Sequence, residues 1–106
     1  MFGFFNMMDN YEDRKVANDE INGAVIDTVS VSDSEQPYET GVKHESYNKG
    51  AWVIVEMYDS EEEAEIGHSK WVDTFRKGLP ETLTDVGTSD IKQFIGVDKT
   101  FVKNKD

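Results

Sequence analysis

Two histidines and a dense group of carboxylates are the residues of this chain that could do chemistry. Glu65 and His68 form a Glu-x-x-His motif, whose spacing places both side chains on one side of a helix. Di-metal carboxylate sites use this motif, but they need two copies and two further carboxylates on facing helices. His44 and His68 could instead bind a metal with one carboxylate, Glu56 or Asp59, although no spacing in the chain requires it. We therefore predict structural roles for both histidines, and neither a metal nor a cofactor.

The motifs that mark common catalytic centres are absent from the sequence. It contains no cysteine, which excludes a disulfide, a thiol nucleophile and a cysteine-based zinc site. It has neither the Gly-x-Ser-x-Gly elbow of serine hydrolases nor the Gly-x-Gly-x-x-Gly loop of dinucleotide-binding proteins. The Asp-x-Asp-x-Asx-Gly pattern of an EF-hand is also missing. We therefore predict that the protein is not an enzyme and has no catalytic residues.

The net charge of −11 over 106 residues is distributed unevenly. Residues 1–65 contain 16 acidic and 4 basic side chains, whereas residues 66–106 contain 6 acidic and 7 basic ones. Direct binding to nucleic acid needs clustered Lys and Arg, so this balance argues against it. An acidic surface keeps a protein soluble and attracts basic partners. The apolar residues 1–8 are too few for a membrane span and lack the basic residues of a signal peptide, so no membrane partner is predicted.

Six carboxylates fall within the ten positions 56–65 and form the candidate interaction surface: Glu56, Asp59, Glu61, Glu62, Glu63 and Glu65. Three of them would occupy the first turn of a helix that begins after Ser60, where the helix dipole favours negative charge. The same carboxylates could also form a surface that imitates the charge of nucleic acid. The sequence leaves both interpretations open.

Three segments have the composition of β-strands and are joined by two short turns. Ala24–Val31 is rich in β-branched residues, Tyr38–His44 alternates, and Ala51–Tyr58 is apolar on both faces. The second turn, residues 47–50, supplies Asn and Gly, which tolerate positive φ. Strands joined by short turns predict an antiparallel meander. Thr82–Val86 is compatible with a further short strand.

Residues Ser60–Lys77 have the strongest helical pattern in the chain. Ser60 and Glu63 form a capping box, and Gly78 followed by Pro80 ends the helix. Its inner face carries five residues at helical spacing: Ala64, His68, Trp71, Val72 and Phe75. A second, short helix is predicted at Ser89–Ile95. Residues 9–22 are predicted as a short helix or an irregular arm, and residues 97–106 as an edge strand or a loose tail.

These elements predict one α+β domain over residues 1–106, with an N-terminal arm at 1–22. We expect an antiparallel meander of three or four strands, the long helix packed on one face, and a short C-terminal helix. If the long helix crosses the meander, polar side chains from the second turn and from the strand–helix junction can meet. This candidate polar network comprises His44, Tyr47, Tyr58 and His68, and a structural role is favoured over an interaction surface.

Two patterns carry a resemblance to known proteins. Residues 38–44 read Tyr-x-Thr-x-Val-x-His, and residues 62–71 read Glu-Glu-Ala-x-x-Gly-His-x-x-Trp. With the opening residues 1–5 and the segment 10–14, they make the chain resemble a group of small uncharacterised proteins of tailed bacteriophages. The resemblance covers most of residues 1–75. It implies a phage origin and brings no activity with it.

Two functions are expected from these observations. The first is a non-enzymatic phage structural or accessory protein that acts through protein–protein contacts in the virion. The second is an acidic inhibitor that imitates nucleic acid and binds a host nuclease or defence complex. The expected partner is a virion protein or a basic host protein, located in the virion or the host cytoplasm. A homo-oligomer is compatible with either function.

Overall fold

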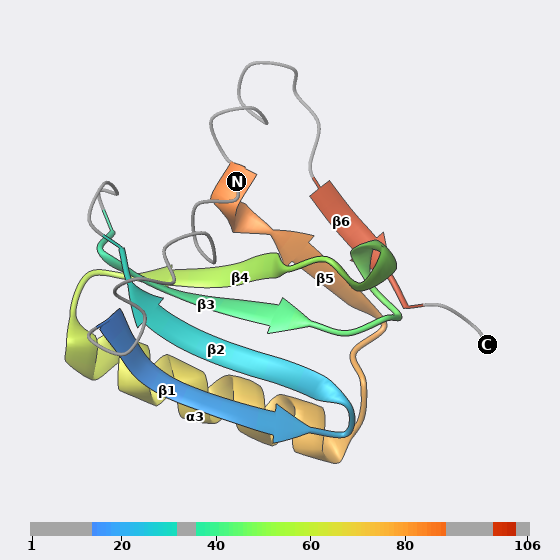
Figure 1. Cartoon of the computed structure of the whole chain (residues 1–106), viewed down its shortest axis with the longest axis horizontal. Coiled ribbons are helices and arrows are strands. Elements are labelled where there is room, and N and C mark those ends of the chain that lie inside the picture. Colours follow the sequence, from blue (N-terminus) through green and yellow to red (C-terminus); the bar gives the residue numbers. More distant parts are fainter. Residues whose placement is uncertain (1–13, 32–35, 89–98, 104–106) are drawn as a thin grey trace.

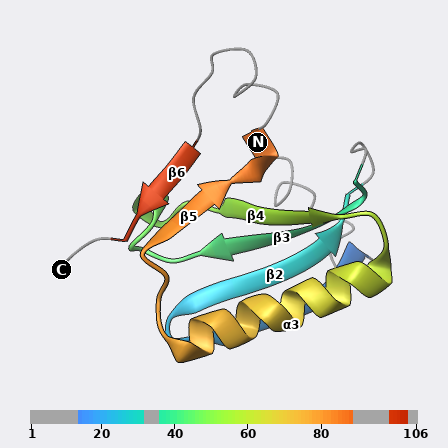
Figure 2. The same cartoon turned by 180° about the vertical axis from the view of Figure 1, so that it is seen from behind.

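The main sheet of the protein has four strands. The computed structural model describes residues 14–31, 36–88 and 99–103. The strands are β1 (Lys15–Ile21), β2 (Ala24–Ser30), β3 (Tyr38–Lys43) and β4 (Val53–Tyr58), paired in this order and each antiparallel to the next. The helix α3 (Glu61–Lys77) lies across one face of the sheet (Figures 1 and 2). The α+β class, the antiparallel meander, predicted with three or four strands, and the long helix on one face are thereby confirmed.

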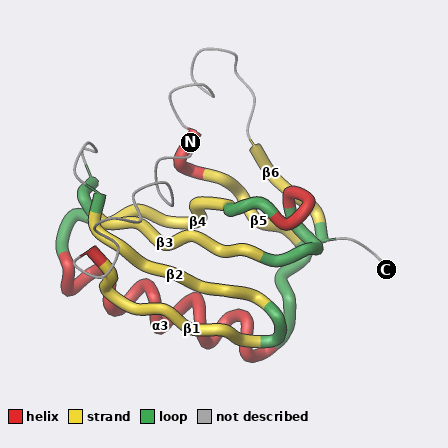
Figure 3. The backbone as a smooth tube through the Cα atoms, viewed as in Figure 1, coloured by secondary structure: helices red, strands yellow, loops and turns green. Residues whose placement is uncertain are grey.

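A smaller sheet lies beside β4. It consists of β5 (Thr82–Asp85) and β6 (Lys99–Val102), which pair antiparallel (Figure 3). The 3-10 turn η3 (Val86–Thr88) packs so closely on β4 that a Cβ at Gly87 would lie 3.0 Å from Ile54 Cγ1. β5 confirms the strand predicted at Thr82–Val86. For the tail, residues 97–106, an edge strand or a loose segment was predicted, and β6 agrees with the strand. The helix predicted at Ser89–Ile95 lies outside the described residues, and the helical element before it is only the 3-10 turn η3.

Strand β1 lies where the sequence predicted a short helix or an irregular arm. Over residues 15–21 that prediction was wrong, because β1 is an edge strand with mostly polar, exposed positions and therefore has no apolar stripe. Asn22 and Gly23 form the turn to β2, with φ angles of 53° and 83°. Positive φ at both positions matches the two-residue hairpin turn for which Asn-Gly is the preferred sequence.

The same turn holds the end of the long helix. Asn22 Nδ2 donates to the carbonyl oxygen of Phe75 at 2.7 Å, which satisfies one of the carbonyls that the last turn of a helix leaves free. β1 and α3 run side by side in the same direction (Figure 1). The hairpin therefore fixes where α3 lies along the sheet.

Both ends of α3 follow the predicted signals. Ser60 Oγ accepts a hydrogen bond from Glu63 N at 3.2 Å, and Glu63 Oε1 accepts one from Asp59 N at 3.2 Å. Ser60 is thereby confirmed as the N-cap, whereas the Glu63 side chain reaches back to the N–H of Asp59 and not to that of Ser60, as a capping box would require. Gly78, with φ of 144°, follows the last helical residue, as predicted.

The apolar core lies between the sheet and the C-terminal half of α3. Val72 and Phe75 on α3 belong to one buried cluster with Ile26, Val42 and Val53 on the strands. Tyr47 is 1% exposed and packs edge-on against Phe75, with ring centroids 6.5 Å apart. The predicted inner face of α3 is confirmed, since four of its five residues are buried and the fifth, Trp71, packs against the cluster.

Gly67 brings the N-terminal half of α3 into close contact with β4. A Cβ at this position would overlap the ring of Tyr58, whose Cζ would lie only 2.5 Å away. Real Cβ atoms do not approach other atoms so closely, so any larger residue must displace the ring or the helix. Glycine inside a helix is otherwise unfavourable, and this contact explains its presence.

We predict that Gly67→Ala destabilises the protein by about 2 kcal/mol, because overpacking outweighs the roughly 1 kcal/mol that alanine gains from helix propensity. Urea unfolding followed by tryptophan fluorescence measures the change. Ser69→Ala, on the exposed side of the same helix, is the matched control and should change stability by less than about 0.5 kcal/mol. A Gly67→Ala variant more stable than the wild type would contradict this packing.

Candidate functional site

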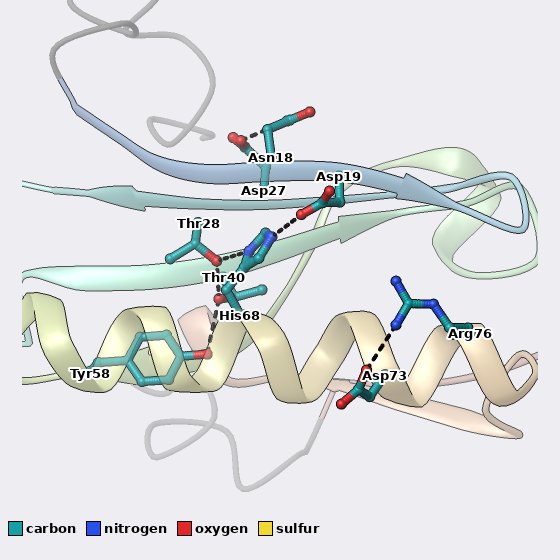
Figure 4. A network of polar contacts seen from close by, with 9 residues as sticks. All are labelled: Asn18, Asp19, Asp27, Thr28, Thr40, Tyr58, His68, Asp73 and Arg76. Carbon is teal, nitrogen blue, oxygen red and sulfur yellow. Dashed lines mark hydrogen bonds and ion pairs between the residues drawn. The ribbon is translucent and has the colours of Figure 1, made fainter.

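A continuous chain of hydrogen bonds crosses the main sheet beneath α3 (Figure 4). It begins at Asp19 on β1, whose Oδ2 lies 2.8 Å from His68 Nε2. His68 Nδ1 lies 2.7 Å from Thr28 Oγ1 on β2, which lies 2.5 Å from Thr40 Oγ1 on β3. Thr40 Oγ1 is 2.9 Å from the hydroxyl of Tyr58 on β4. Up to this point each of the four strands contributes one residue, and α3 contributes the histidine.

The chain ends at Glu56, also on β4. Its Oε1 accepts hydrogen bonds from Lys70 Nζ at 2.7 Å and Trp71 Nε1 at 2.8 Å, and it lies 3.1 Å from the Tyr58 hydroxyl. We call the six residues of this chain the cross-sheet network: Asp19, His68, Thr28, Thr40, Tyr58 and Glu56. Its two ends reach solvent, since the side chains of Asp19 and Glu56 are 50% and 34% exposed, whereas Thr28 and Thr40 are 0% exposed.

The sheet register explains why these side chains meet. Thr28 and Thr40 are direct partners across β2 and β3, so they point to the same face of the sheet. Thr40 pairs in turn with Glu56, and an irregularity in the pairing follows at Gly41, which pairs with Ile54. A bulge of this kind changes the direction of neighbouring side chains. The polar residues consequently gather under the N-terminal half of α3.

Burial and charge set the protonation states of Glu56 and Tyr58, at the β4 end of the network. Burial by itself would raise the pKa of Glu56, but the hydrogen bonds from Lys70 and Trp71 and the charge of Lys70 lower it below its ordinary value. Burial raises the pKa of Tyr58, the hydrogen bond with Thr40 opposes this effect, and the nearby Glu56 carboxylate raises the pKa further. At neutral pH the network therefore ends in a carboxylate that accepts and a phenol that keeps its proton.

Asp19, His68 and Thr28 have the composition of a carboxylate–imidazole–hydroxyl triad. In a hydrolase the hydroxyl must reach the substrate, but Thr28 is completely buried and His68 is 4% exposed. The arrangement therefore satisfies buried polar groups rather than activating a nucleophile. Among the described residues, no group of three or more His, Asp or Glu side chains could hold a metal ion.

The predicted network of four residues is divided between two places. Tyr58 and His68 belong to the cross-sheet network. His44 and Tyr47 lie together elsewhere, with ring centroids 5.9 Å apart. The Tyr47 hydroxyl donates to the carbonyl oxygen of Pro80, and burial, followed by the charge of Glu81, raises the pKa of this phenol. Tyr47 therefore ties the turn before β4 to the segment after α3.

The predicted acidic surface loses one member. Glu56 is engaged in the cross-sheet network, whereas five carboxylates are exposed around the start of α3: Asp59, Glu61, Glu62, Glu63 and Glu65. We call these five the helix-start carboxylates. None of them forms an ion pair with another described residue. Ile66, the next residue of α3, is 66% exposed beside them.

Sequence reasoning missed three members of the network, Asp19, Thr28 and Thr40. The alternation of Tyr38–His44 places Thr40 on the same face as Val42, which was a signal that its hydroxyl points into the core. Asp19 could not be found, because β1 itself was not predicted. The pairing of Thr28 with Thr40 depends on the register, which the individual segments do not specify.

Glu39 is a further functional candidate that the sequence did not reveal. It follows Tyr38 on β3 and precedes Thr40, so its side chain points to the sheet face opposite the network. It is 8% exposed. Burial, and secondarily the negative charge of Asp85, raises the pKa of Glu39 to about 7.

The comparisons with known proteins give no family to which the chain could be assigned. No protein-family model, no curated protein and no solved structure matches it. In the part of the chain that the structure describes, no helix is long and apolar enough to cross a membrane.

We predict that Glu39→Gln stabilises the protein at alkaline pH. Because the folded state raises the pKa of Glu39 from 4.5 to about 7, its stabilising contribution is complete below 4.5 and is lost as the pH rises through about 7. Glutamine imitates the protonated form at every pH. We expect a gain on the order of 1–3 kcal/mol near pH 8, and almost none near pH 4.5.

Urea unfolding at these two pH values measures the difference. Glu20→Gln, a substitution at an exposed position of β1, is the control for removal of one negative charge from the acidic chain. An equal gain from both variants, or a Glu39→Gln gain that does not change with pH, would refute a raised pKa for Glu39.

Proposed function

We propose that this protein is a non-enzymatic structural or accessory protein of a tailed bacteriophage that acts through protein–protein contacts in the virion. The observation that carries the proposal is the group of helix-start carboxylates, which are exposed and form no ion pair with a described residue. Such a surface attracts a basic partner and orients it before contact. The phage origin rests on the resemblance of residues 38–44 and 62–71.

The surface around the start of α3 combines charge with an apolar centre. Glu62 and Glu63 lie four and three positions before Ile66, so all three side chains are neighbours on the helix surface. Ile66 is 66% exposed. An apolar side chain surrounded by charges fits a partner that presents a small apolar pocket with Lys or Arg at its rim.

The cross-sheet network supports this surface from below. His68 is anchored at both ring nitrogens, and Gly67 packs against Tyr58. These contacts lie one turn after the glutamates, so the helix start is held against the sheet. A surface that is already ordered loses little conformational entropy when a partner binds.

A second candidate function is inhibition of a host nuclease or defence complex in the host cytoplasm. The density of the helix-start carboxylates favours it, because closely spaced and unneutralised negative charges resemble a run of phosphates. In this case the partner's nucleic-acid site would bind the start of α3. Nucleic acid would then compete with the protein for the partner, whereas it would not displace a virion protein.

The first experiment is affinity capture of the tagged protein from infected bacteria, followed by mass spectrometry of the bound proteins. Capsid, portal or tail proteins among them would support the virion function. A host nuclease that is released by added duplex DNA would support the inhibitor function instead. A captured enzyme complex that depends on this chain for activity would contradict both.

We predict that the variant with Glu61, Glu62, Glu63 and Glu65 all changed to Gln binds the captured partner about 10- to 30-fold more weakly at low salt, since each charge contributes a few tenths to 1 kcal/mol. Isothermal titration calorimetry or surface plasmon resonance measures the change. Added salt should weaken the wild type more than the variant. Glutamine at position 63 can still accept the hydrogen bond from Asp59 N, and Ser60 still caps the helix, so the helix start is retained.

The matched control removes four charges elsewhere, by amide substitution of Glu20, Glu45, Asp73 and Glu81, all of which are exposed. It should retain most of the wild-type affinity. Equal losses in both variants would mean that net charge alone governs binding. Wild-type affinity in the first variant would remove the helix-start carboxylates from the interface.

A further inference from the structure

The ends of the cross-sheet network limit the direction of every hydrogen bond between them. A carboxylate accepts hydrogen bonds and cannot donate them, and the network ends in the carboxylates of Asp19 and Glu56. A threonine or tyrosine hydroxyl has one proton to donate. Each bond in the chain therefore needs one proton from one of the groups between the two ends.

Counting these protons shows that one form of His68 completes the chain and the other does not. Five hydrogen bonds connect Asp19 to Glu56 through His68, Thr28, Thr40 and Tyr58. Three hydroxyls and a neutral imidazole supply one proton fewer than these bonds require. An imidazole protonated at both nitrogens supplies the missing proton. The number of satisfied bonds is therefore tied to the charge of His68.

With neutral His68, four protons serve five contacts, so one contact stays without a proton. We place it at the longest contact, between Tyr58 and Glu56, and all donors then point toward Asp19. Nε2–H donates to Asp19, Thr28 donates to Nδ1, Thr40 donates to Thr28 and Tyr58 donates to Thr40. The contact from Tyr58 to Glu56 then has no proton. It is the longest contact of the chain, at 3.1 Å, and Glu56 retains its hydrogen bonds from Lys70 and Trp71.

With His68 protonated at both nitrogens, the three hydroxyls point the other way. Nδ1–H now donates to Thr28, Thr28 donates to Thr40, Thr40 donates to Tyr58, and Tyr58 donates to Glu56. No heavy atom has to move, because each hydroxyl only rotates about its C–O bond. One proton enters from solvent at His68, and no other group changes its charge.

We propose that the cross-sheet network is a pH-dependent switch, in which protonation of His68 reverses the three hydroxyls and adds a hydrogen bond to Glu56 at the other side of the sheet. The titratable and polar groups around His68 come from all four strands and from α3. β1 contributes Asp19, β2 and β3 contribute only threonine hydroxyls, and β4 contributes Glu56 and Tyr58. From α3 itself, Glu65 lies three positions before His68 on the same side of the helix, and Lys70 pairs with Glu56. The switch stands independently of the function proposed above.

Protonation of His68 affects the hydrogen bond between Trp71 and Glu56. Its indole Nε1 shares the oxygen Oε1 of Glu56 with Lys70 Nζ and the Tyr58 hydroxyl. A third or fourth donor on one oxygen weakens the others, because they compete for the same lone pairs. Protonation of His68 should therefore change the hydrogen bond of Trp71, although the imidazole does not contact the indole.

Solution NMR of the ¹⁵N- and ¹³C-labelled chain at a series of pH values tests the switch. The ring nitrogens of His68 report its protonation, and the Trp71 Nε1–H and Tyr58 Cζ signals report the other end. We expect both distant signals to change with the same midpoint as His68. His44, the other histidine of the chain, provides a reference midpoint.

Thr40→Val is the decisive variant, since it removes the central hydroxyl and keeps the shape of the side chain. We expect His68 to titrate still and the responses of Trp71 and Tyr58 at its midpoint to disappear. Thr40→Ser retains the hydroxyl and should retain both responses. If Thr40→Val does not fold, Tyr58→Phe interrupts the chain at its last hydroxyl. Trp71 is then the remaining distant signal, and its response should disappear.

Two results would overturn the switch. The first is a wild-type protein in which Trp71 and Tyr58 do not change at the midpoint of His68. The second is a full response in Thr40→Val, or in Tyr58→Phe where that variant is used, which would show that the charge of His68 acts through space.

Discussion

The structure depends on one constraint, which is that the polar centre of the sheet has to be hydrogen-bonded once α3 covers it. Thr28 and Thr40 are completely buried, and a buried hydroxyl without a partner costs about 1–3 kcal/mol. His68 supplies the partner from the helix. Its two ring nitrogens are occupied by Thr28 and Asp19, so both the rotation of α3 and its position along β1 are fixed at this residue. Asn22 repeats the restraint at the helix end, through its bond to the Phe75 carbonyl.

The residues of α3 that pack against the sheet determine which residues of the helix are exposed to solvent. With His68 pointing inward, Gly67 must lie against Tyr58, and Ile66 and Glu62 are directed to solvent. The acidic start of α3 is thus a consequence of the same contacts that bury the network. The same packing also separates Glu56 from the helix-start carboxylates. Glu56 is fixed by Lys70 and Trp71 and is held below its ordinary pKa, whereas the helix-start carboxylates remain available to a partner.

The sequence predicted those features whose signals are local. The structure confirms the Ser60 N-cap of α3, its inner face, β5 and the meander of β2, β3 and β4, all of which are encoded within short segments. β1 was missed although Asn22-Gly23 is a strong hairpin signal, because the polar pattern of an edge strand concealed it. The network could not be predicted as a unit. His68 meets Thr28 across 40 residues and Asp19 across 49, and such contacts depend on the register, which no single segment specifies.

A polar layer of this kind adds specificity that an apolar layer would not. If β3 shifted by one residue against β2, Thr40 would move to the opposite face and leave Thr28 without its partner. If α3 moved by one turn, His68 would lose both Thr28 and Asp19. Apolar side chains tolerate such shifts with small losses, whereas unsatisfied buried polar groups do not. The cross-sheet network therefore selects a single register of helix and sheet, and that register determines the position of the acidic residues available for binding.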